Sequence, residues 1–469
     1  MIFSRSLQDG IFPTLWKKSF VNPVHKQGDR TSVLNYRPIC LLSPIASLLE
    51  HIINTKLISY ISPLISPKQH GFIPGKSVST NLLQLSEEVT HSIENGHQVD
   101  TVYLDLSKAF DTIDHGKLLH KLHNLGIDLS LIKWFSSYLH AREQIVQVQG
   151  YESNSYIVTS GVAQGSRLGP LLFALFVNDL VDEVRFSNIE LFADNCRISK
   201  TVRCTQDALD FQDDINRVVH WIMINGLTIN THKCQKITFA RKNNLLSSTY
   251  FINGTRINEV DSIRDLGVIL DKNWTFDNHI QNVLSKSSKC LGFIKRLSYN
   301  FISLDTLTYL FKALVLPTLT YTSIIWARFT QNRFEELNSI VKKFLRFASY
   351  KNGNPMGLRD HDYSDISRLC QVYRVESIHE YRDICFVADY STGNIRSTAL
   401  DRNFTERNLT YNLRFPRKYQ EYAHRNNYVF NAPIYRIIRS WNTISEDVRR
   451  HLLDYRSKNL LKETVLKCF

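Results

Sequence analysis

Residues 188–200 read NIELFADNCRISK and have the pattern of two short β-strands joined by a tight turn. The apolar run 189–193 forms the first predicted strand, and residues 196–199 form the second. Asp194 and Asn195 lie between the two predicted strands. Both residue types tolerate the positive φ angles of two-residue hairpin turns, so we predict the turn at this dipeptide. Asp194 then has two interpretations: a solvated turn residue, or a carboxylate held at a strand end to bind a metal.

A second acidic residue ends another apolar run. Residues 101–106 read TVYLDL, and Asp105 is the acid. If the two strands are neighbours in one sheet, Asp105 and Asp194 can converge on a cation from one edge. Mg²⁺ prefers hard oxygen ligands, and two such ions can hold the attacking and leaving oxygens of a phosphoryl displacement. The spacing of the two acids alone does not decide between a metal site and two solvated turn residues.

The residues around these acids suit a nucleotide site. Phe110 follows Asp105 by five residues, at the expected strand-to-helix turn. Gln164 belongs to a glycine-rich turn just before an apolar helix. Lys26 and Arg37 flank a loop, where they can meet a triphosphate through charge-assisted hydrogen bonds. For these two cations, solvated surface charge is the alternative interpretation.

Composition narrows the class of protein. The 469 residues are 43% hydrophobic, which is ordinary for a globular chain with several subdomains. A formal charge of +13 suits a polyanionic partner, with nucleic acid first and an anionic membrane surface second. The eight cysteines include no C-x-x-C pair, so neither a zinc site nor a disulfide framework is indicated. No signal peptide or membrane span is evident, and we expect a soluble, intracellular protein without a membrane partner.

Local patterns predict a mixed α/β region followed by helices. Helices are expected at 47–61 and 206–224, and a hairpin around Gly150. From about residue 275 the sequence becomes a series of amphipathic helices. One of them is expected to break at Pro317.

Several longer motifs occur in a fixed order along the chain. They are NYRPICLLSPIASLLE, QHGFIPGKSVSTNLL, YLDLSKAFDTIDH, GVAQGSRLGPLLFALFVNDL, LFADN and RDLGVILDKNWTFDNHI. Together they resemble the reverse transcriptases of non-LTR (LINE-type) retrotransposons, closest to the jockey clade. The resemblance implies an α/β (α+β) right-hand polymerase fold with fingers, a palm of antiparallel sheet plus helices, and a helical thumb. It places the fingers at 1–100, the palm with some finger elements at 101–275, the thumb at 276–350 and a mostly helical, Arg/Tyr-rich C-terminal region at 351–469.

The resemblance also implies roles for individual residues at the metal site. The carboxylates of Asp105 and Asp194 and the backbone carbonyl of Leu106 would hold two Mg²⁺ ions, which Mn²⁺ can replace. Asn195 occupies the second acidic position of the hairpin. Lys233 would protonate the leaving pyrophosphate, and an ordinary surface lysine is the alternative.

Further residues would contact the substrates. Deoxynucleotide binding is implied for Lys26, Arg37, Phe110, Gln164 and Gly165. Phe110 would block a ribose 2′-OH, or alternatively only pack in the palm, and Gln164 could instead cap the helix that follows. Nucleic-acid binding is expected at Arg167 in the palm, at Lys289 and Arg296 in the thumb, and at Arg417 and Tyr419 in the tail.

The hairpin departs from the family pattern, which has Asp at both positions of the turn. Asn195 keeps an oxygen ligand but loses a unit charge, worth about 4 kcal/mol at roughly 4 Å and an effective dielectric constant of about 20. At about 1.36 kcal/mol per decade this is roughly a thousandfold in rate, as an upper estimate. We therefore expect reduced activity, as in a decaying element copy, although some template-dependent polymerases work with Asp-Asn here.

Other departures lie nearby. Ile73 stands where the family usually has Arg, Ala163 replaces Pro, and Arg167 replaces a small apolar residue. Arg167 either faces template phosphates or is another lesion.

The leading hypothesis is an RNA-directed DNA polymerase that uses an RNA template, a DNA primer or nicked target DNA, and dNTPs. The alternative is a catalytically dead polymerase fold that binds RNA or DNA. A nucleotidyltransferase using RNA primers is disfavoured by Phe110. The chain begins at the fingers, so we expect the endonuclease activity to come from elsewhere. Cytoplasmic ribonucleoprotein and nucleus are the expected locations.

Overall fold

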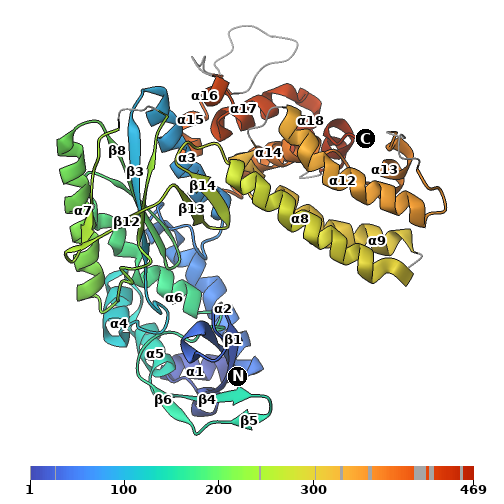
Figure 1. The fold of residues 1–469 in the computed structure, drawn as a ribbon. Coiled ribbons are helices and arrows are strands. Elements are labelled where there is room, and N and C mark those ends of the chain that lie inside the picture. Colours follow the sequence, from blue (N-terminus) through green and yellow to red (C-terminus); the bar gives the residue numbers. More distant parts are fainter. Residues whose placement is uncertain are drawn as a thin grey trace. The chain divides into compact units, whose positions relative to one another are not determined.

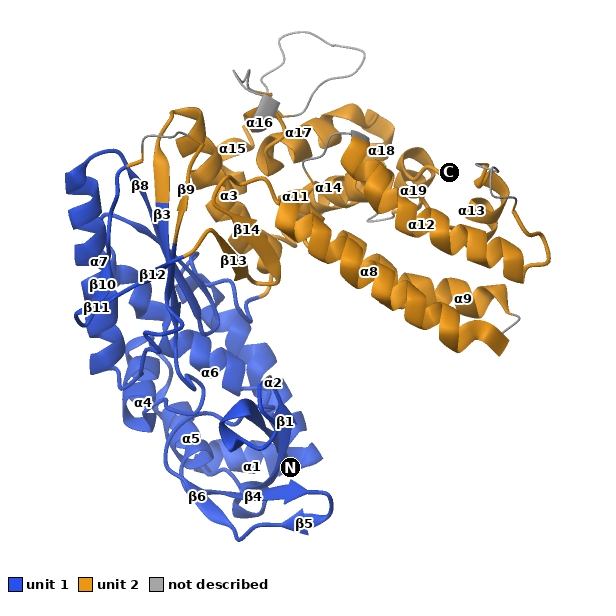
Figure 2. Cartoon of the chain, viewed as in Figure 1, with its two compact units in different colours: residues 1–73, 100–236, 246–259 blue, residues 74–99, 237–245, 260–469 orange. Residues whose placement is uncertain are grey.

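The computed structural model describes residues 2–26, 28–241, 245–300, 303–327, 331–356, 362–405, 419–421, 427–454 and 458–469. It contains two compact units (Figure 2). Unit 1 comprises residues 1–73, 100–236 and 246–259, and unit 2 comprises residues 74–99, 237–245 and 260–469. The α+β class expected from the sequence is confirmed, whereas the division into four domains stays a prediction. No helix in the described ranges is both long and apolar enough to cross a membrane.

Unit 1 holds helices and most of the strands (Figure 1). Its helices are α1 (Ile2–Asp9), α2 (Pro44–Ile61), α4 (His115–Asn124), α5 (Leu129–Leu139), α6 (Gly169–Phe176) and α7 (Thr205–Ile224). Its strands are β1 (Lys18–His25), β2 (Tyr36–Leu41), β4 (Arg142–Val148), β5 (Tyr151–Glu152), β6 (Tyr156–Val158), β7 (Asn188–Phe192), β8 (Asn195–Val202), β10 (Phe251–Ile252), β11 (Thr255–Arg256) and β12 (Asn258–Glu259). The boundary between the units passes through β3 (Gln98–Asp105) and β9 (Gln235–Phe239).

One sheet of unit 1 carries the two cations expected near the triphosphate. Strand β1 pairs antiparallel with β2 and parallel with β4, and β4 pairs antiparallel with β5 and β6. Val24 pairs with Arg37, and Lys26 follows the end of β1, so both cations belong to one hairpin. The predicted hairpin around Gly150 is confirmed, because Gln149 and Gly150 join β4 to β5 with positive φ angles of 51° and 86°.

The second sheet has the strand order β12-β9-β3-β8-β7. Strands β3 and β8 are therefore neighbours, as the metal-site hypothesis requires for Asp105 and Asp194. Helix α7 lies along this sheet (Figure 1). Strands β7 and β8 form the predicted antiparallel hairpin.

The turn of this hairpin lies one residue earlier than predicted. Phe192 pairs with Asn195, so the two turn residues are Ala193 and Asp194, and Ala193 has a φ of +55°. The reason is the register: Ile189 pairs with Ile198, and Glu190 with Arg197. A turn at Asp194-Asn195 would instead set Ile189 opposite a lysine and would separate Glu190 from Arg197. Apolar and charge matching across the strands therefore decide the turn position.

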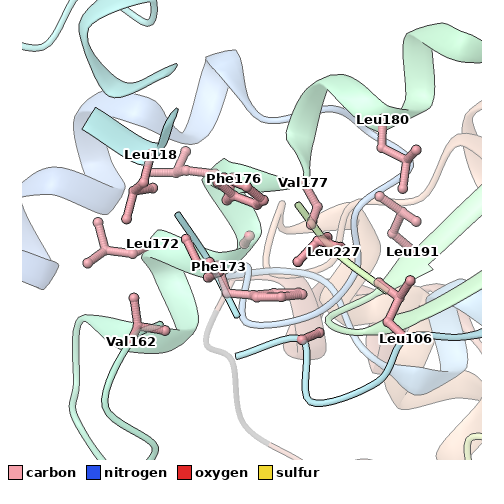
Figure 3. Packing of buried hydrophobic residues seen from close by; sticks show 14 of the residues in the cluster. Leu106, Leu118, Val162, Leu172, Phe173, Phe176, Val177, Leu180, Leu191 and Leu227 are labelled. Carbon is pink, nitrogen blue, oxygen red and sulfur yellow. The ribbon is translucent and has the colours of Figure 1, made fainter. Parts of the chain in front are cut away.

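A continuous apolar core in unit 1 includes residues of β3, β7 and β8, three neighbouring strands of the second sheet (Figure 3). Helix α6 lies at its centre, and each of its residues except Pro170 is buried. The helix begins at Gly169, whose N–H is accepted by the Ser166 hydroxyl at 2.8 Å, and Pro170 follows in its first turn, where no N–H is needed. Leu106 and Leu191, each next to or near a candidate catalytic acid, belong to the same core. Burying such a side chain stabilises the fold by roughly 1.5–3 kcal/mol, which anchors the ends of β3 and β7.

Unit 2 is mainly helical. Its helices are α3 (Val78–Glu94), α8 (Asp277–Leu297), α9 (Leu304–Leu310), α10 (Leu316–Thr320), α11 (Ser323–Trp326), α12 (Gln331–Lys351), α13 (Ser364–Cys370), α14 (Val375–Ser391), α15 (Thr398–Asn403), α16 (Asn427–Phe430), α17 (Pro433–Thr443), α18 (Glu446–Asp454) and α19 (Asn459–Val465). Strands β13 (Ser262–Asp265) and β14 (Val268–Asp271) form a hairpin. The break expected at Pro317 is present, as a π-helical turn over Phe311–Val315 before α10.

Candidate active site

The two acids predicted from the sequence lie at the ends of neighbouring strands. Asp105 is the last residue of β3, and Asp194 is the second turn residue of the β7–β8 hairpin. The Asp194 carboxyl interacts electrostatically with Asp105, and also with the cations Lys26 and Arg37. Four groups expected to share a site are thus gathered within unit 1.

The pKa of the Asp194 carboxyl is raised above its usual value. Asp194 is exposed at the surface, yet nearby protein atoms crowd its carboxyl and remove hydration, which is the largest cause. The negative charge of Asp105 adds to the rise, while Lys26 and Arg37 oppose it. A carboxyl group whose ionisation is opposed by a nearby carboxylate is stabilised in its charged form by a divalent cation bound between the two.

This pKa shift predicts how cation binding depends on pH. Asp194 must be ionised to bind a divalent ion, and a raised pKa means that protons compete for it at a higher pH than for an ordinary Asp, whose pKa is about 3.9. Cation affinity is therefore expected to fall earlier on acidification. Mn²⁺ titrations followed by electron paramagnetic resonance between pH 8 and pH 4 measure this. Asp194→Asn is the control: it should weaken Mn²⁺ binding and remove the dependence of Mn²⁺ affinity on pH. If the affinity of the parent protein falls with a midpoint pH at or below the pKa of an ordinary Asp, the expectation is contradicted.

Residues 228–233 hold the end of β3. The Asp105 carbonyl accepts the Asn230 N–H at 2.9 Å, and the Ser107 N–H donates to Thr228 at 2.8 Å. Neither of these bonds uses the carbonyl of Leu106, the third predicted metal ligand. Lys233 lies near the acid, with 4.0 Å between Nζ and Asp105 Oδ2. Both side chains are about half exposed, so this ion pair adds little stability and leaves the ammonium available for proton transfer.

Asn195 is exposed at the start of β8. Its Nδ2 donates to the Phe192 carbonyl at 3.3 Å, closing the end of the hairpin. A carboxylate cannot make this bond, because it has no proton to donate. The amide therefore adds a hairpin contact at the position where the sequence motif leads us to expect a second charge.

The donor set fits a hard divalent cation. It comprises two carboxylates and a backbone carbonyl, and among the described residues no group of three or more His, Cys, Asp and Glu side chains is suited to a metal. Magnesium sites that also bind substrate phosphates usually use one or two carboxylates. The residues present thus match a site completed by a nucleotide and not a closed protein cage.

Phe110 is held firmly between other rings. It stacks on Phe173 of α6, with ring centroids 4.3 Å apart and planes 13° apart, and meets Phe72 edge-on at 6.2 Å. Its carbonyl accepts the Val162 N–H at 2.8 Å. The ring is only half-buried. The palm-packing interpretation is therefore correct for one face of the ring, and the accessible remainder leaves the sugar-blocking role open.

Gln164 and Gly165 lie against the first sheet. The Gln164 side chain donates to Asp111 Oδ1 at 2.8 Å. The backbone carbonyl of Gln164 accepts the Cys40 N–H at 2.6 Å. Gly165 has a φ of +110°, and a Cβ there would lie 2.6 Å from the Cys40 carbonyl oxygen. Gln164 does not cap α6, so that alternative is wrong: its side chain bonds Asp111, and the Ser166 hydroxyl accepts the N–H of Gly169 at the helix start.

Lys26 and Arg37 are both exposed, and within the described residues neither forms an ion pair. The Lys26 N–H donates to the Asn35 carbonyl at 2.8 Å, which fixes the backbone of the hairpin and leaves the side chain unconstrained. Two unpaired cations facing a carboxylate pair suit an anionic ligand held between them.

The predicted nucleic-acid contacts have mixed outcomes. Arg167 has an exposed side chain, while its backbone N–H donates to buried Glu50 at 2.7 Å. Lys289 and Arg296 are exposed on α8 of unit 2. The prediction that Tyr419 binds RNA is wrong. Tyr419 is 4% exposed, packs on Phe404 and bonds Ser391, so its ring is not accessible for stacking with RNA. Arg417 lies outside the described residues.

The sequence patterns did not reveal which residues pack against the β7–β8 hairpin and support it. Residues 68–71 run beside β7, and buried Glu190 bonds Lys68 at 3.0 Å and His70 at 3.1 Å. The motif QHGF was visible, but its contact with a strand 120 residues away was not.

Much of this sequence is similar to the sequences of known proteins. The family model "Reverse transcriptase (RNA-dependent DNA polymerase)" matches residues 24–293. The "RNA-directed DNA polymerase from mobile element jockey" of Drosophila melanogaster is 27% identical over 380 residues, covering 77% of this chain and 40% of that protein. The "Probable RNA-directed DNA polymerase from transposon X-element" of the same species is 26% identical over 359 residues, covering 74% of this chain and 39% of that protein. This chain thus spans about 40% of the length of these curated relatives.

A solved structure also aligns with the chain. The apo telomerase of Candida tropicalis superposes with a TM-score of 0.45 at 10% identity, covering 97% of this chain and 70% of that chain.

Proposed function

The chain belongs to the reverse transcriptase (RNA-dependent DNA polymerase) family, and from this premise we propose that it copies an RNA template by adding dNTPs to a primer 3′-hydroxyl, as part of a non-LTR retrotransposon. One observation carries the proposal: Asp105 ends β3 and Asp194 lies in the turn that leads into the neighbouring strand β8, where the charges of Lys26 and Arg37 also act on it. A pair of acids facing a pair of cations is the arrangement needed to hold a metal-bound triphosphate.

In the proposed reaction the primer 3′-hydroxyl loses its proton to water as its oxygen bonds to the α-phosphorus of the dNTP, and the bond from that phosphorus to the oxygen that bridges to the β-phosphate breaks, releasing pyrophosphate. Two divalent ions, Mg²⁺ or Mn²⁺, would supply charge stabilisation for the attacking and leaving oxygens when bound. Asp105, Asp194 and the Leu106 carbonyl would hold them. The protein's other residues bind and orient the substrates.

Each of those residues has a proposed task. Lys26 and Arg37 neutralise the β- and γ-phosphates. Lys233 donates a proton from Nζ to the leaving pyrophosphate oxygen. Gln164 and Gly165 form the surface against which the new base pair rests.

Phe110 is proposed to select deoxyribose. Phe173 fixes its ring at 4.3 Å, so the ring cannot turn away from a 2′-hydroxyl. Phe110→Val is expected to raise the ratio of ribonucleotide to deoxynucleotide incorporation by about tenfold or more. Single-nucleotide extension with dTTP and UTP on poly(rA)/oligo(dT) measures the ratio. Phe72→Val, which removes only the edge-on ring contact of Phe110, is the matched control, and an unchanged ratio in Phe110→Val would refute the assignment.

Asn195 favours a second candidate, a polymerase fold that binds RNA or DNA without catalysis. Primer extension on poly(rA)/oligo(dT) with Mg²⁺ and with Mn²⁺ separates the two. Extension by this chain or by Asn195→Asp, and none by Asp105→Ala, supports the polymerase. Absence of extension in every variant, with RNA binding retained, supports the binding protein.

Partners and location are part of the proposal. The template would be RNA, and the primer a DNA end or a nicked target supplied by an endonuclease activity. The protein would act as a cytoplasmic ribonucleoprotein and in the nucleus.

A further inference from the structure

The segment 68–71 runs parallel to the strand that leads into the catalytic turn. The His70 N–H donates to the Leu191 carbonyl at 2.8 Å, and the Leu191 N–H donates to the Lys68 carbonyl at 2.9 Å. Gln69 and Leu191 form a parallel bridge. The segment thus extends the sheet by one short pairing at the hairpin, and at no other described strand.

Gln69 reaches from this segment to the turn itself. Its side chain is fully buried, and Oε1 accepts the N–H of Gly71 at 2.8 Å and that of Ala193 at 3.3 Å. Its Nε2 is buried without a hydrogen-bond partner. A buried amide with an unused donor costs free energy, so the favourable contribution of the Gln69 side chain comes from its acceptor, Oε1.

Gly71 permits this approach. A Cβ on Gly71 would lie 2.3 Å from the Ala193 nitrogen and 3.0 Å from the Phe192 carbonyl carbon. Both are backbone atoms, which cannot move aside as a flexible side chain can. Ala193 itself has a φ of +55°, a conformation that disfavours residues other than glycine. The turn is therefore held in a costly shape by contacts on one side.

Glu190 fastens the segment to β7 one residue before Leu191. It is 4% exposed and bonds Lys68 and His70. Burial alone would raise the pKa of this carboxyl, but the bond from His70 and the charge of Lys68 outweigh it, and the pKa is lowered. The ionised, paired form holds segment and strand together.

We propose that Gln69 is a positioning residue, which through the Ala193 N–H fixes the turn that carries Asp194, with Gly71 providing the clearance. The inference rests on the proposed polymerase function. It assigns to the QHGF motif the task of setting where one catalytic carboxylate lies.

The test compares Gln69→Leu, which removes the acceptor, with Gln69→Glu, which keeps it. Gln69→Leu is expected to lower kcat by about tenfold to a hundredfold, because small displacements of catalytic groups have effects of this size. The KM for dNTP and the affinity for template-primer should change by less than about twofold. Gln69→Glu should recover most of kcat. Equal losses in both variants, or a kcat loss accompanied by equal losses of binding and thermal stability, would overturn the proposal.

A measurement without catalysis separates this inference from the proposed function. Hydrogen exchange at the Ala193 amide and Mn²⁺ affinity are followed in the same full-length variants. Faster exchange confined to the hairpin and weaker Mn²⁺ binding in Gln69→Leu support the positioning role even if no variant extends a primer, in which case only the polymerase assignment fails. Unchanged exchange and Mn²⁺ binding overturn the positioning role whatever the activity.

Gly71→Ala tests the clearance. It should displace the turn and reduce kcat and Mn²⁺ affinity by at least as much as Gln69→Leu. Gly116→Ala is the matched control in the same unit, because its Cβ would meet only the Asp114 side chain, at 3.2 Å. Activity of Gly71→Ala equal to that of the control would overturn this part.

Discussion

Replacing Asn195 with Asp is expected to raise the rate of dNTP incorporation by up to about a thousandfold. The change restores a unit charge within roughly 4 Å of the proposed cations, worth about 4 kcal/mol at an effective dielectric constant of about 20. Each decade of rate requires about 1.36 kcal/mol. The substitution also removes the donor that bonds the Phe192 carbonyl at 3.3 Å, so the new carboxylate is repelled from that carbonyl and free to turn toward a cation.

Single-turnover primer extension in Mg²⁺ measures this gain. Asn188→Asp is the matched control, because Asn188 is exposed at the other end of the same hairpin and pairs with Ser199. It adds the same charge far from the turn and should leave the rate unchanged. Equal rates in the parent and in Asn195→Asp, with Mg²⁺ and with Mn²⁺, would show that the amide is not what limits this chain.

Asp105→Ala is expected to abolish extension, with a loss of about a thousandfold or more by the same charge argument. The loss is best measured in the Asn195→Asp protein, because its higher extension rate allows a larger decrease in rate to be measured. The Asp105 side chain is 45% exposed, so stability should change by no more than about 0.5 kcal/mol. A thermal unfolding curve checks that the variant is folded.

The control for this loss is Asp182→Ala, an exposed acid of the same unit outside the site. It should extend primers at the parental rate. Retention of more than a tenth of the activity by Asp105→Ala would remove this carboxylate from the catalytic centre.

The strand pattern made the main features of the site predictable. Apolar runs ending in acids located Asp105 and Asp194, because a short apolar run bounded by turn residues is a local property of the sequence. The turn was misplaced by one residue, since its position depends on which residues face each other across β7 and β8. That matching, Ile189 with Ile198 and Glu190 with Arg197, is a property of the pair and not of either strand.

Other features depend on contacts between distant segments. Gln164 bonds Asp111 across 53 residues, and Lys68 bonds Glu190 across 122. No local periodicity encodes such pairs. Tyr419 shows the opposite failure: its aromatic and basic neighbours in the sequence suggested a surface for RNA, whereas its burial against Phe404 is set by tertiary packing.

The proposed polymerase site requires above all that Asp105 and Asp194 hold the same divalent ions. Anomalous diffraction from the protein soaked with Mn²⁺, bound to template-primer and an unreactive dNTP analogue, tests this directly. We expect Mn²⁺ peaks within coordination distance of both carboxylates and of the nucleotide phosphates. Mn²⁺ bound elsewhere, or to one of these acids without the other, would contradict it.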